Sequence, residues 1–439
     1  MLRSMWSGVS GLKTHQMEMD VIGNNIANVN TTGYKSKAYT FKDTLYQTMS
    51  NAMGATDVKG SVSARQVGLG TRTGAIKTNI SAQGSAMTTY RTLDLMINGD
   101  SFFTVQKDIG DPTTVAYTRD GNLDIDANGS LVTSSNGYYV LGWTGTETTG
   151  AIGRLDIVTD ATKTLAGQAT SVVTVSGNID KNDTNISSDD GKVIKLEVYD
   201  AAGDTYTLKY SLTDGGDEDP TTYTLSLTDI LDSNGDSMTV NTTVADISLV
   251  YDPSDGTLST VNGGTGTTSA LSVNFTDPDT NKSVTLGLTL DFSDTTNYNT
   301  KGSSTIKMTK GDVDGNNAGY PVGTMTGYSI ANDGGIHIEY SNGQTRQLGT
   351  IATAIFSNSS GLSSIGDNLF QTTLNSGEAQ YQKVDADGGY ISSGTLEMSS
   401  VDLAMEFTNM ITTQRGFQAN SKVITTSDEM LQILKGLKR

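Results

Sequence analysis

Residues 20–35 read DVIGNNIANVNTTGYK, and this stretch decides the fold because it marks where an N-terminal helix must end. Asn28 and Asn30 suit helix termination, since short polar residues are common where a helix stops. Residues 31–33 then supply a turn that precedes extended chain. The stretch therefore predicts a helix over residues 4–28, followed by extended structure.

A seven-residue apolar repeat runs along this helix and along a second one predicted over residues 400–437. Such a repeat forms a seam on one helix face. By pattern alone, an ordinary pair of core helices fits as well. Glycines at positions 8, 11, 23 and 416 weaken isolated helices by about 1 kcal/mol each relative to Ala, so packing partners are expected. We place the assembly contacts on the seam residues Leu2, Met5, Val9, Leu12, Met19, Ile22, Ile26, Leu403, Met410, Phe417, Ile424 and Leu431.

The body between the two helices has a different character. The chain has 439 residues, which suggests about three domains at roughly 150 residues each. It contains 49 Gly and only 5 Pro, a composition that favours short strands joined by tight turns. Cysteine is absent, so disulfides, thiolate metal sites and cysteine nucleophiles are excluded. A mainly β body is the expectation.

Charge is distributed unevenly around a net value of −19. Residues 1–100 hold ten Lys and Arg against six Asp and Glu, and residues 400–439 hold five against four, so the acidic surplus lies in the middle. An acidic body repels phosphate backbones, which argues against nucleic-acid binding. The N-terminus lacks a long apolar run, so neither a cleaved signal peptide nor membrane insertion is expected.

Both ends of the chain resemble the family of flagellar rod and hook proteins. Residues 414–420, QRGFQAN, are similar to the family's C-terminal helix, and residues 95–103, LMINGDSFF, with residues 117–123, YTRDGNL, are similar to its inner β-domain. Residues 362–370 also fit. The signature residues in the opening stretch are Gly23, Asn24, Asn25, Ala27, Asn28, Asn30, Thr32, Gly33, Tyr34 and Lys35.

This resemblance implies a layered architecture in which the chain ends form the inner layer. The fold class that we predict is a mainly β body of two or more nested β-domains, with the N- and C-terminal α-helices paired as a coiled-coil-like inner domain. The predicted parts are paired terminal helices at 1–30 and 400–439, an extended linker region at 31–90 and 361–399, an inner β-domain at 91–145 and 322–360, and an acidic outer β-domain at 146–321.

The function implied by the resemblance is structural, without catalysis or cofactor. The large middle insertion favours a hook subunit over a shorter rod subunit. Such a subunit polymerises with many copies of itself into a flexible curved tube, which transmits torque from rod to filament and lets exported subunits pass through its channel. The implied partners are the distal rod, the hook-filament junction protein, the hook cap and the hook-length-control protein. The implied location is extracellular, in the flagellar hook, after export without a cleaved signal peptide.

Three other classes of protein stay open at this point. A distal rod subunit, or another flagellar axial subunit, would use the same terminal helices in a straight, stiff tube. A β-rich secreted adhesin would not need those helices. An enzyme is not expected, because no residue stands out as a nucleophile or a base. A secreted hydrolase that uses paired acids stays open, since Asp is abundant and the sequence gives no distances between carboxylates.

Two acidic loops and two histidines could suggest metal or catalytic sites. Residues 124–129, DIDANG, match the first half of a calcium loop, but Ser135 stands where a bidentate Glu is required. Asn-Gly at 128–129 predicts a hairpin instead. Residues 312–316, DVDGN, predict a turn. Alternation places His337 on the solvent face of a strand with Ile336 and Ile338 inward, and His15 is expected at a helix interface. We therefore predict no catalytic, cofactor-binding or metal-binding residues.

Overall fold

The computed structural model describes residues 2–55, 59–111, 114–147, 150–215, 221–241, 244–277 and 282–436. The chain forms two compact units. The first unit comprises Met1–Thr159, Tyr328–Ile338 and Arg346–Arg439, so it contains both ends of the chain, and the second comprises Asp160–Gly327 and Glu339–Thr345. Three strands contain residues of both units: β24 (Gly323–Ile330), β25 (Gly335–Tyr340) and β26 (Thr345–Ile351).

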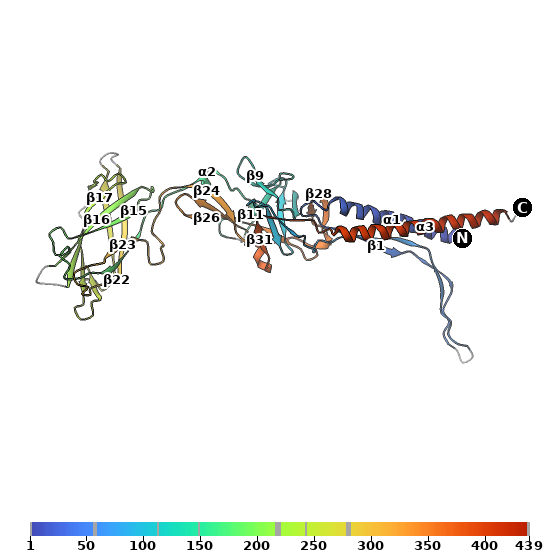
Figure 1. Ribbon diagram of the computed structural model, residues 1–439, viewed down its shortest axis with the longest axis horizontal. Coiled ribbons are helices and arrows are strands. Elements are labelled where there is room, and N and C mark those ends of the chain that lie inside the picture. The colour runs from blue at the N-terminus through green and yellow to red at the C-terminus, as the bar shows by residue number, and fades with distance from the viewer. Residues whose placement is uncertain are drawn as a thin grey trace. The chain divides into compact units, whose positions relative to one another are not determined.

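A long helix forms at each end of the chain, as predicted, and both helices belong to the first unit (Figure 1). These helices are α1 (Leu2–Ala27) and α3 (Leu403–Gly436). The chain after α1 makes a turn in which the Asn28 amide donates to the Asn24 carbonyl at 3.2 Å. Gly33 then adopts a φ of +67°, a conformation that glycine reaches without a Cβ clash. The predicted helix end and turn are confirmed.

The C-terminal helix begins at Leu403, three residues later than predicted, because Asp402 caps it. The Asp402 carboxylate accepts hydrogen bonds from the amides of Ala404, at 2.9 Å, and Met405, at 3.2 Å. A side-chain acceptor at this position satisfies amide groups that have no partner within the first helical turn. The residues from Ser400 to Asp402 therefore stay outside the helix.

The two helices lie side by side and run antiparallel (Figure 1). The Ser4 and Ser427 hydroxyl oxygens lie 3.4 Å apart near one end of the contact, and Asn25 donates to the Glu406 carboxylate at 3.0 Å near the other. Packing of the terminal helices against each other is thus confirmed. The coiled-coil-like form of that packing stays a prediction.

A β-ribbon follows α1 and is made of two consecutive antiparallel pairs. Strand β1 pairs with β4 from Lys37↔Thr78 to Asp43↔Thr71, and β2 pairs with β3 from Tyr46↔Gly68 to Ser50↔Arg65. We call residues 37–78 the ribbon. Its strands are β1 (Lys37–Asp43), β2 (Tyr46–Ser50), β3 (Arg65–Gly68) and β4 (Thr71–Thr78).

Short strands from both halves of the chain build the remainder of the first unit. Strand β7 pairs with β8, β11 and β27, always antiparallel, so Phe103 lies opposite Thr353. A buried apolar cluster that includes Phe102, Phe356 and Phe370 fills the interior. The strands are β5 (Ala86–Thr88), β6 (Leu95–Asn98), β7 (Phe102–Gln106), β8 (Val115–Thr118), β9 (Leu123–Ile125), β10 (Leu131–Thr133), β11 (Tyr139–Thr144), β12 (Gly153–Arg154), β27 (Thr353–Ile355), β28 (Ser363–Gly366), β29 (Leu369–Gln371), β30 (Gln380–Gln382), β31 (Tyr390–Ser393) and β32 (Thr395–Glu397), with 3-10 turns η2 (Ser359–Gly361) and η3 (Val384–Asp387).

The second unit contains two five-stranded sheets, ordered β18-β21-β22-β14-β23 and β15-β16-β17-β19-β20. Buried apolar residues of both sheets belong to one continuous cluster, so the unit has a single core. Burial alternates along β16, as expected for a strand with one face on a core. The elements are α2 (Asp160–Lys163), β13 (Thr164–Leu165), β14 (Val172–Asn178), β15 (Lys192–Tyr199), β16 (Thr205–Asp214), β17 (Thr222–Leu231), β18 (Thr239–Val240), β19 (Ile247–Tyr251), β20 (Leu258–Val261), β21 (Thr268–Thr276), β22 (Ser283–Thr296) and β23 (Lys307–Lys310).

The acidic loops identified from sequence are turns. Strands β9 and β10 pair antiparallel, and between them the Asp126 carboxylate accepts from the amides of Asn128, at 3.0 Å, and Ser130, at 2.7 Å. The Asp312 carboxylate accepts from the amides of Asp314, at 3.0 Å, and Asn316, at 2.7 Å. The predicted hairpin and the predicted turn are both confirmed.

The alternation predicted around His337 is also present in β25. Ile336 and Ile338 are buried, whereas Glu339 is exposed and His337 is half-buried. The strand therefore presents its apolar residues to one face, as predicted. None of the described helices has an apolar stretch long enough to cross a membrane.

Candidate assembly interface

Glycine lets α1 and α3 approach closely. A Cβ atom at Gly8 would lie 3.0 Å from the Ile424 side chain, and one at Gly11 would lie 2.7 Å from the Asn420 amide. Both distances are shorter than ordinary non-bonded contacts. These glycines weaken a lone helix, but they also allow the backbone of α1 to lie directly against α3.

His15 lies where α1, α3 and the ribbon meet. Its Nδ1 is 3.0 Å from a Glu18 carboxylate oxygen, and its ring packs edge-to-face against Phe41 of β1 with centroids 5.3 Å apart. On its other side, a Cβ atom at Gly416 would lie 2.7 Å from the imidazole Nε2. His15 is therefore a packing residue between three elements of one chain.

The predicted seam residues are only partly covered within one chain. Ile22 is buried, whereas Val9 and Phe417 are 47% and 40% exposed. Leu403 is also exposed, and the side chain of Leu2 lies outside the described residues. The others are half-buried: Met5, Leu12, Met19, Ile26, Met410, Ile424 and Leu431.

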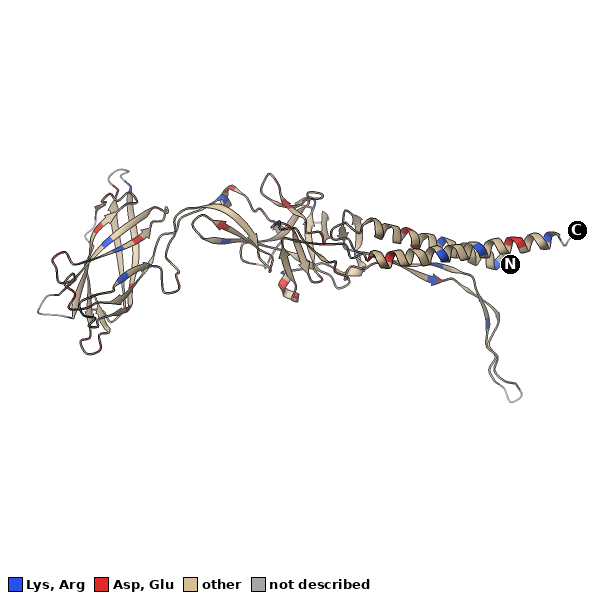
Figure 2. Cartoon of the chain, in the orientation of Figure 1, with Lys and Arg blue, Asp and Glu red and all other residues tan. Residues whose placement is uncertain are grey.

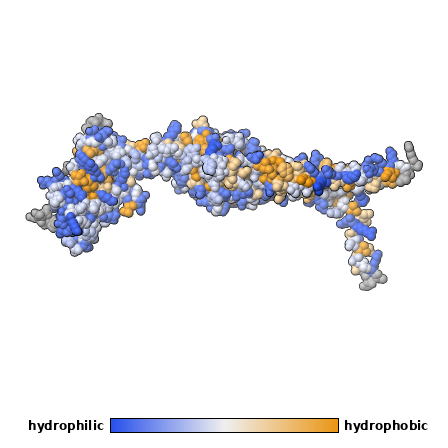
Figure 3. Space-filling model, in the orientation of Figure 1, coloured by the Kyte–Doolittle hydropathy of each residue, from blue (hydrophilic) through white to orange (hydrophobic). Residues whose placement is uncertain are grey.

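Further large apolar side chains on the two helices are exposed. The predicted C-terminal seam extends to Val423, Met430 and Leu434 among them, and the repeat did not identify the others. Trp6 on α1 is 71% exposed. On α3 the strongly exposed ones are Met405, Phe407, Ile411, Val423, Met430, Ile433 and Leu434. Figure 3 shows hydrophobic surface over this helical part, and Figure 2 shows charges of both signs along it. The sequence signal that could have identified such side chains is the presence of large apolar residues at helix positions outside the repeat.

The ribbon contacts part of α1, and the part of the ribbon beyond that contact is exposed. The Thr71 amide donates to the Ser10 hydroxyl at 3.2 Å, and the Thr14 and Thr71 hydroxyl oxygens are 3.1 Å apart. Beyond this contact, exposed apolar side chains lie on β2, at Tyr46 and Met49, and on the chain next to it, at Leu45 and Met53. Sequence reasoning treated this range as an extended linker and did not single out these side chains.

Signature asparagines connect the helices to the ribbon. The Asn25 amide group donates to the Lys37 carbonyl at 2.8 Å and accepts from the Lys37 amide at 2.9 Å. The same side chain reaches Glu406 of α3. The Tyr34 hydroxyl donates to Asn24 at 2.8 Å, and burial raises the pKa of that phenol. Asn25 and Tyr34 thus join three elements through buried polar contacts.

The other signature residues divide between surface and interior. Thr32 donates to the Asp120 carboxylate at 3.0 Å, and a Cβ at Gly33 would lie 2.8 Å from the Asp120 amide nitrogen. A Cβ at Gly23 would meet nothing within 4 Å. In the signature as a whole, Gly23, Asn24, Ala27 and Asn30 are exposed, Asn28 and Thr32 are half-buried, and Asn25, Gly33, Tyr34 and Lys35 are buried.

Lys35 belongs to a buried ion cluster, which we define as Lys35, Arg119 and Glu397. The Lys35 ammonium lies 2.7 Å from one Glu397 oxygen, and the Arg119 guanidinium lies 3.7 Å from the other. Each side chain is at most 2% exposed. Burial lowers the pKa of both Lys35 and Arg119, and the Glu397 charge opposes that effect.

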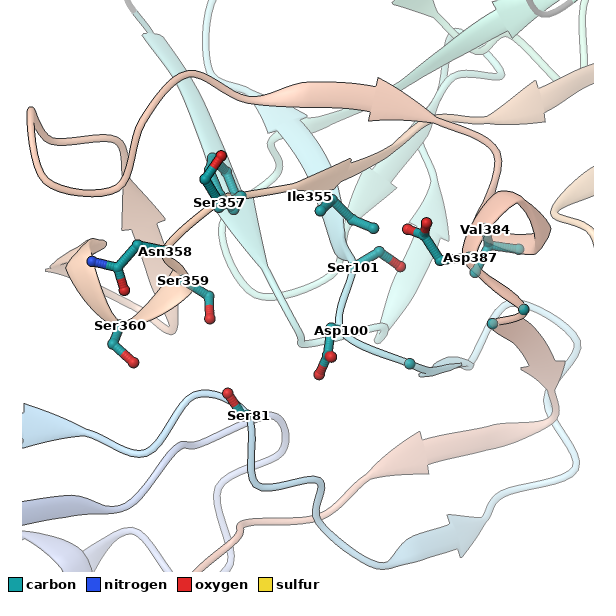
Figure 4. A pocket seen from close by; sticks show the side chains of 14 residues that line it. Ser81, Asp100, Ser101, Ile355, Ser357, Asn358, Ser359, Ser360, Val384 and Asp387 are labelled. Atoms are coloured by element: carbon teal, nitrogen blue, oxygen red, sulfur yellow. The ribbon is translucent and has the colours of Figure 1, made fainter.

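A polar cleft of about 650 Å³ lies in the same unit (Figure 4). Asp100 and Ser101 line it from the turn before β7, and Asp387 lines it from η3. Both histidines lie elsewhere, on α1 and β25. In the part of the chain that the structure describes, no three potential metal-binding side chains gather at one place.

Known protein families match segments of this chain that include both terminal helices. Three protein-family models match: "Flagella basal body rod protein" at residues 5–35, "Flagellar hook protein FlgE/F/G D1 domain" at 96–194, and "Flagellar basal body rod FlgEFG protein C-terminal" at 392–437. The first spans most of α1 with the signature, and the last spans α3.

Several curated relatives match along their whole length. The flagellar hook protein FlgE of Borreliella burgdorferi is 35% identical, and that of Treponema pallidum is 34% identical, each with 100% of both chains covered. The flagellar basal-body rod protein FlgG of Bacillus subtilis is 31% identical with the same coverage. With matches of this extent at both ends and through the body, the chain belongs to the flagellar hook protein family.

Proposed function

We propose that this chain is a structural subunit of the bacterial flagellar hook and that its copies polymerise through their terminal helices into a flexible, curved tube. The observation that carries the proposal is the set of large apolar side chains left exposed on α1 and α3, with Trp6 and Phe407 among them. Exposed apolar surface of this kind marks an interaction site. Identical copies that bind through two different surfaces form helical assemblies when the rotation between copies does not close into a ring, and a helical assembly suits a tube.

Burial of these side chains supplies the energy of assembly in this proposal. Each Å² of apolar surface removed from water contributes about 25 cal/mol, so several large side chains per copy contribute substantially. Small and polar residues at the α1–α3 contact leave those side chains available for neighbouring copies. In the tube, the helix pair packs in a coiled-coil-like manner and lines the channel through which exported subunits pass.

In this proposal the tube bends because the helices and the β-domains have different roles in it. The helical layer holds copies together, and the β-domains of neighbouring copies slide relative to one another. A tube can bend while it rotates when many similar packings differ little in free energy. The tube transmits torque from rod to filament by mechanical contact, and no chemical step is involved.

The proposed setting is the flagellum, outside the cell. The subunit contacts the distal rod at one end of the tube and the hook-filament junction protein at the other. The hook cap and the hook-length-control protein act during assembly. The resemblance of both chain ends to rod and hook proteins supports these partners.

Electron microscopy of flagella from cells that carry this chain tests the proposal. Short curved tubes between rod and filament, labelled by an antibody against the second unit, are expected. Straight, stiff tubes would support the alternative that the chain is a distal rod subunit. The whole-length similarity to a rod protein is the observation that favours this alternative. Absence of label from any tube would contradict the proposal.

A further inference from the structure

The buried ion cluster joins three segments that are distant in sequence. It lies where the two helices meet the short strands of the first unit, which we call the β-domain. Lys35 is the last signature residue, Arg119 follows β8, and Glu397 ends β32 shortly before α3. The Gly33 amide donates to the Glu397 carbonyl at 2.8 Å. The Ser400 amide donates to the Tyr34 carbonyl at 3.0 Å, so the chain leaving α1 lies against the chain entering α3.

Glu397 is the centre of this cluster. Besides Lys35, its Oε1 accepts from the Gly84 amide at 2.9 Å, and the Lys35 ammonium also donates to the Ala82 carbonyl at 2.7 Å. Arg119 donates to the Gly99 carbonyl at 2.7 Å. Each member is thus held by backbone as well as by charge, which restricts its position.

The cluster is nevertheless costly. In the described part of the chain, Arg119 Nε and Nη1 and Glu397 Oε2 are buried without a hydrogen-bond partner. Two cations face one buried carboxylate, and exposed Asp100 is the further acidic group whose charge acts on both cations. Replacing a buried ion pair by apolar residues is often neutral or stabilising, so such a cluster is weak evidence for stability.

We propose that the buried ion cluster is a positioning device, which fixes the direction in which α1 and α3 leave the β-domain and thereby gives the assembled tube its uniform curvature. This inference rests on the proposed function and deepens it. Charged groups accept only partners of opposite charge at defined places, whereas apolar contacts slide with little penalty. Removing charge from the cluster therefore changes tube shape more than it changes the stability of the subunit.

A neutral triple variant, Lys35→Met with Arg119→Met and Glu397→Gln, separates shape from stability. The Gln keeps an acceptor for the Gly84 amide, and no unpaired charge is left. In cells that carry this variant, we expect tubes whose curvature and pitch are no longer uniform in electron micrographs. The melting temperature of the purified subunit should stay close to that of the wild type. The control is Lys163→Met with Asp160→Asn, an exposed ion pair of the second unit, which should leave both unchanged.

The single variant Glu397→Gln gives a second measure, because it leaves two buried cations without their carboxylate. It should lower the melting temperature and reduce the number of tubes, whereas the triple variant recovers both. Tubes of wild-type curvature from the triple variant would overturn the inference, and so would unfolding of the triple variant, which would make the cluster a stabilising element. Failure of the wild-type chain to appear in any tube would instead overturn the proposed function.

Discussion

Four aspartates in the β-body have the same local role in tight loops that each contain a glycine. Asp126, Asp200, Asp232 and Asp312 each accept hydrogen bonds from the amides two and four residues later. The residue three positions after each is a glycine with positive φ. The carboxylate thus closes a tight loop, and glycine supplies the left-handed conformation that the loop needs.

Buried aspartates in the second unit predict a loss of stability in acid. The Asp180 carboxylate accepts from the amides of Asn182, Thr300 and Gly302, and these bonds hold its pKa at about 2 despite burial, which opposes them. The Asp183 pKa is likewise about 2. Since an unfolded Asp titrates near 3.9, the unfolded chain binds protons first as pH falls. Stability from these groups is complete above about pH 4 and is lost towards pH 2.

Thermal unfolding of the full chain between pH 7 and pH 2 measures this effect. Asp180→Asn should lower the melting temperature of the second unit at pH 7, because the backbone amides donate to both carboxylate oxygens and an Asn side chain has only one acceptor oxygen. Its melting temperature should then fall less between pH 4 and pH 2 than that of the wild type. Asp189→Asn, on an exposed residue, is the control. Parallel acid profiles for wild type and Asp180→Asn would contradict the prediction.

Gly11→Ala and Gly23→Ala should have different effects on assembled tubes. Both substitutions favour an isolated helix by about 1 kcal/mol. At Gly11 the new methyl would lie 2.7 Å from the Asn420 amide, whereas at Gly23 it would meet no atom of the chain within 4 Å. Tubes of the Gly11 variant should dissociate at a lower temperature than wild-type tubes, followed by light scattering, and tubes of the Gly23 variant should not. Equal stability of the two variants would show that close helix approach is unimportant.

At the scale of elements, α1 and α3 are paired through one face and unpaired on another. Small and polar side chains, such as Ser4 and Ser427, form part of the face between them. Larger apolar side chains, such as Trp6 and Ile433, lie outside it. This arrangement is the reverse of a self-sufficient helix pair, in which the largest apolar side chains would be buried between the helices.

Phe417→Asp should abolish tube formation while the β-body keeps its melting temperature. In a single chain Phe417 is already 40% exposed, so a carboxylate there stays hydrated and costs little. When a neighbouring copy covers this position, the carboxylate becomes buried and unpaired, which costs several kcal/mol per copy, roughly 3–5. Sedimentation and electron microscopy of the assembled fraction measure the outcome.

The matched control lies in the second unit. Asp236→Asn changes an exposed charge whose carboxylate does not cap its loop, since Asp232 has that role. Exposed charges contribute little to stability, so tubes should persist and at most their salt sensitivity should change. If Phe417→Asp polymerised normally while Asp236→Asn abolished tubes, the helices would not be the assembly surface.

At the scale of the whole molecule, the β-cores are independent of the N-terminal helix. Among the residues that the structure describes, none from α1 belongs to the core of the second unit or to the buried apolar cluster around Phe102. Removing residues 1–30 should therefore leave a soluble chain with unchanged β-sheet content by circular dichroism and an unchanged unfolding transition of the second unit. The same truncation should form no tubes. Tube formation by the truncated chain would contradict the proposed role of the helices.

Sequence by itself determined the local structure of this protein. The end of α1, the hairpin at Asp126, the turn at Asp312 and the alternation in β25 all follow from hydrogen bonds or side-chain directions within a few residues. The resemblance of the chain ends to a family then indicated a structural role. These features can be predicted without knowing which distant segments meet, because the interacting groups lie within a few residues of one another.

Tertiary structure alone decided which faces and which charges meet. The seven-residue repeat marked Val9 and Phe417 as seam residues, but the register of α1 against α3 leaves them exposed and places Gly8 and Gly11 in the contact. Lys35 reads from sequence as one more signature residue, yet it meets Glu397 across 362 positions. A contact at that separation depends on how the β-domain brings the two chain ends together, and no local pattern of residues encodes it.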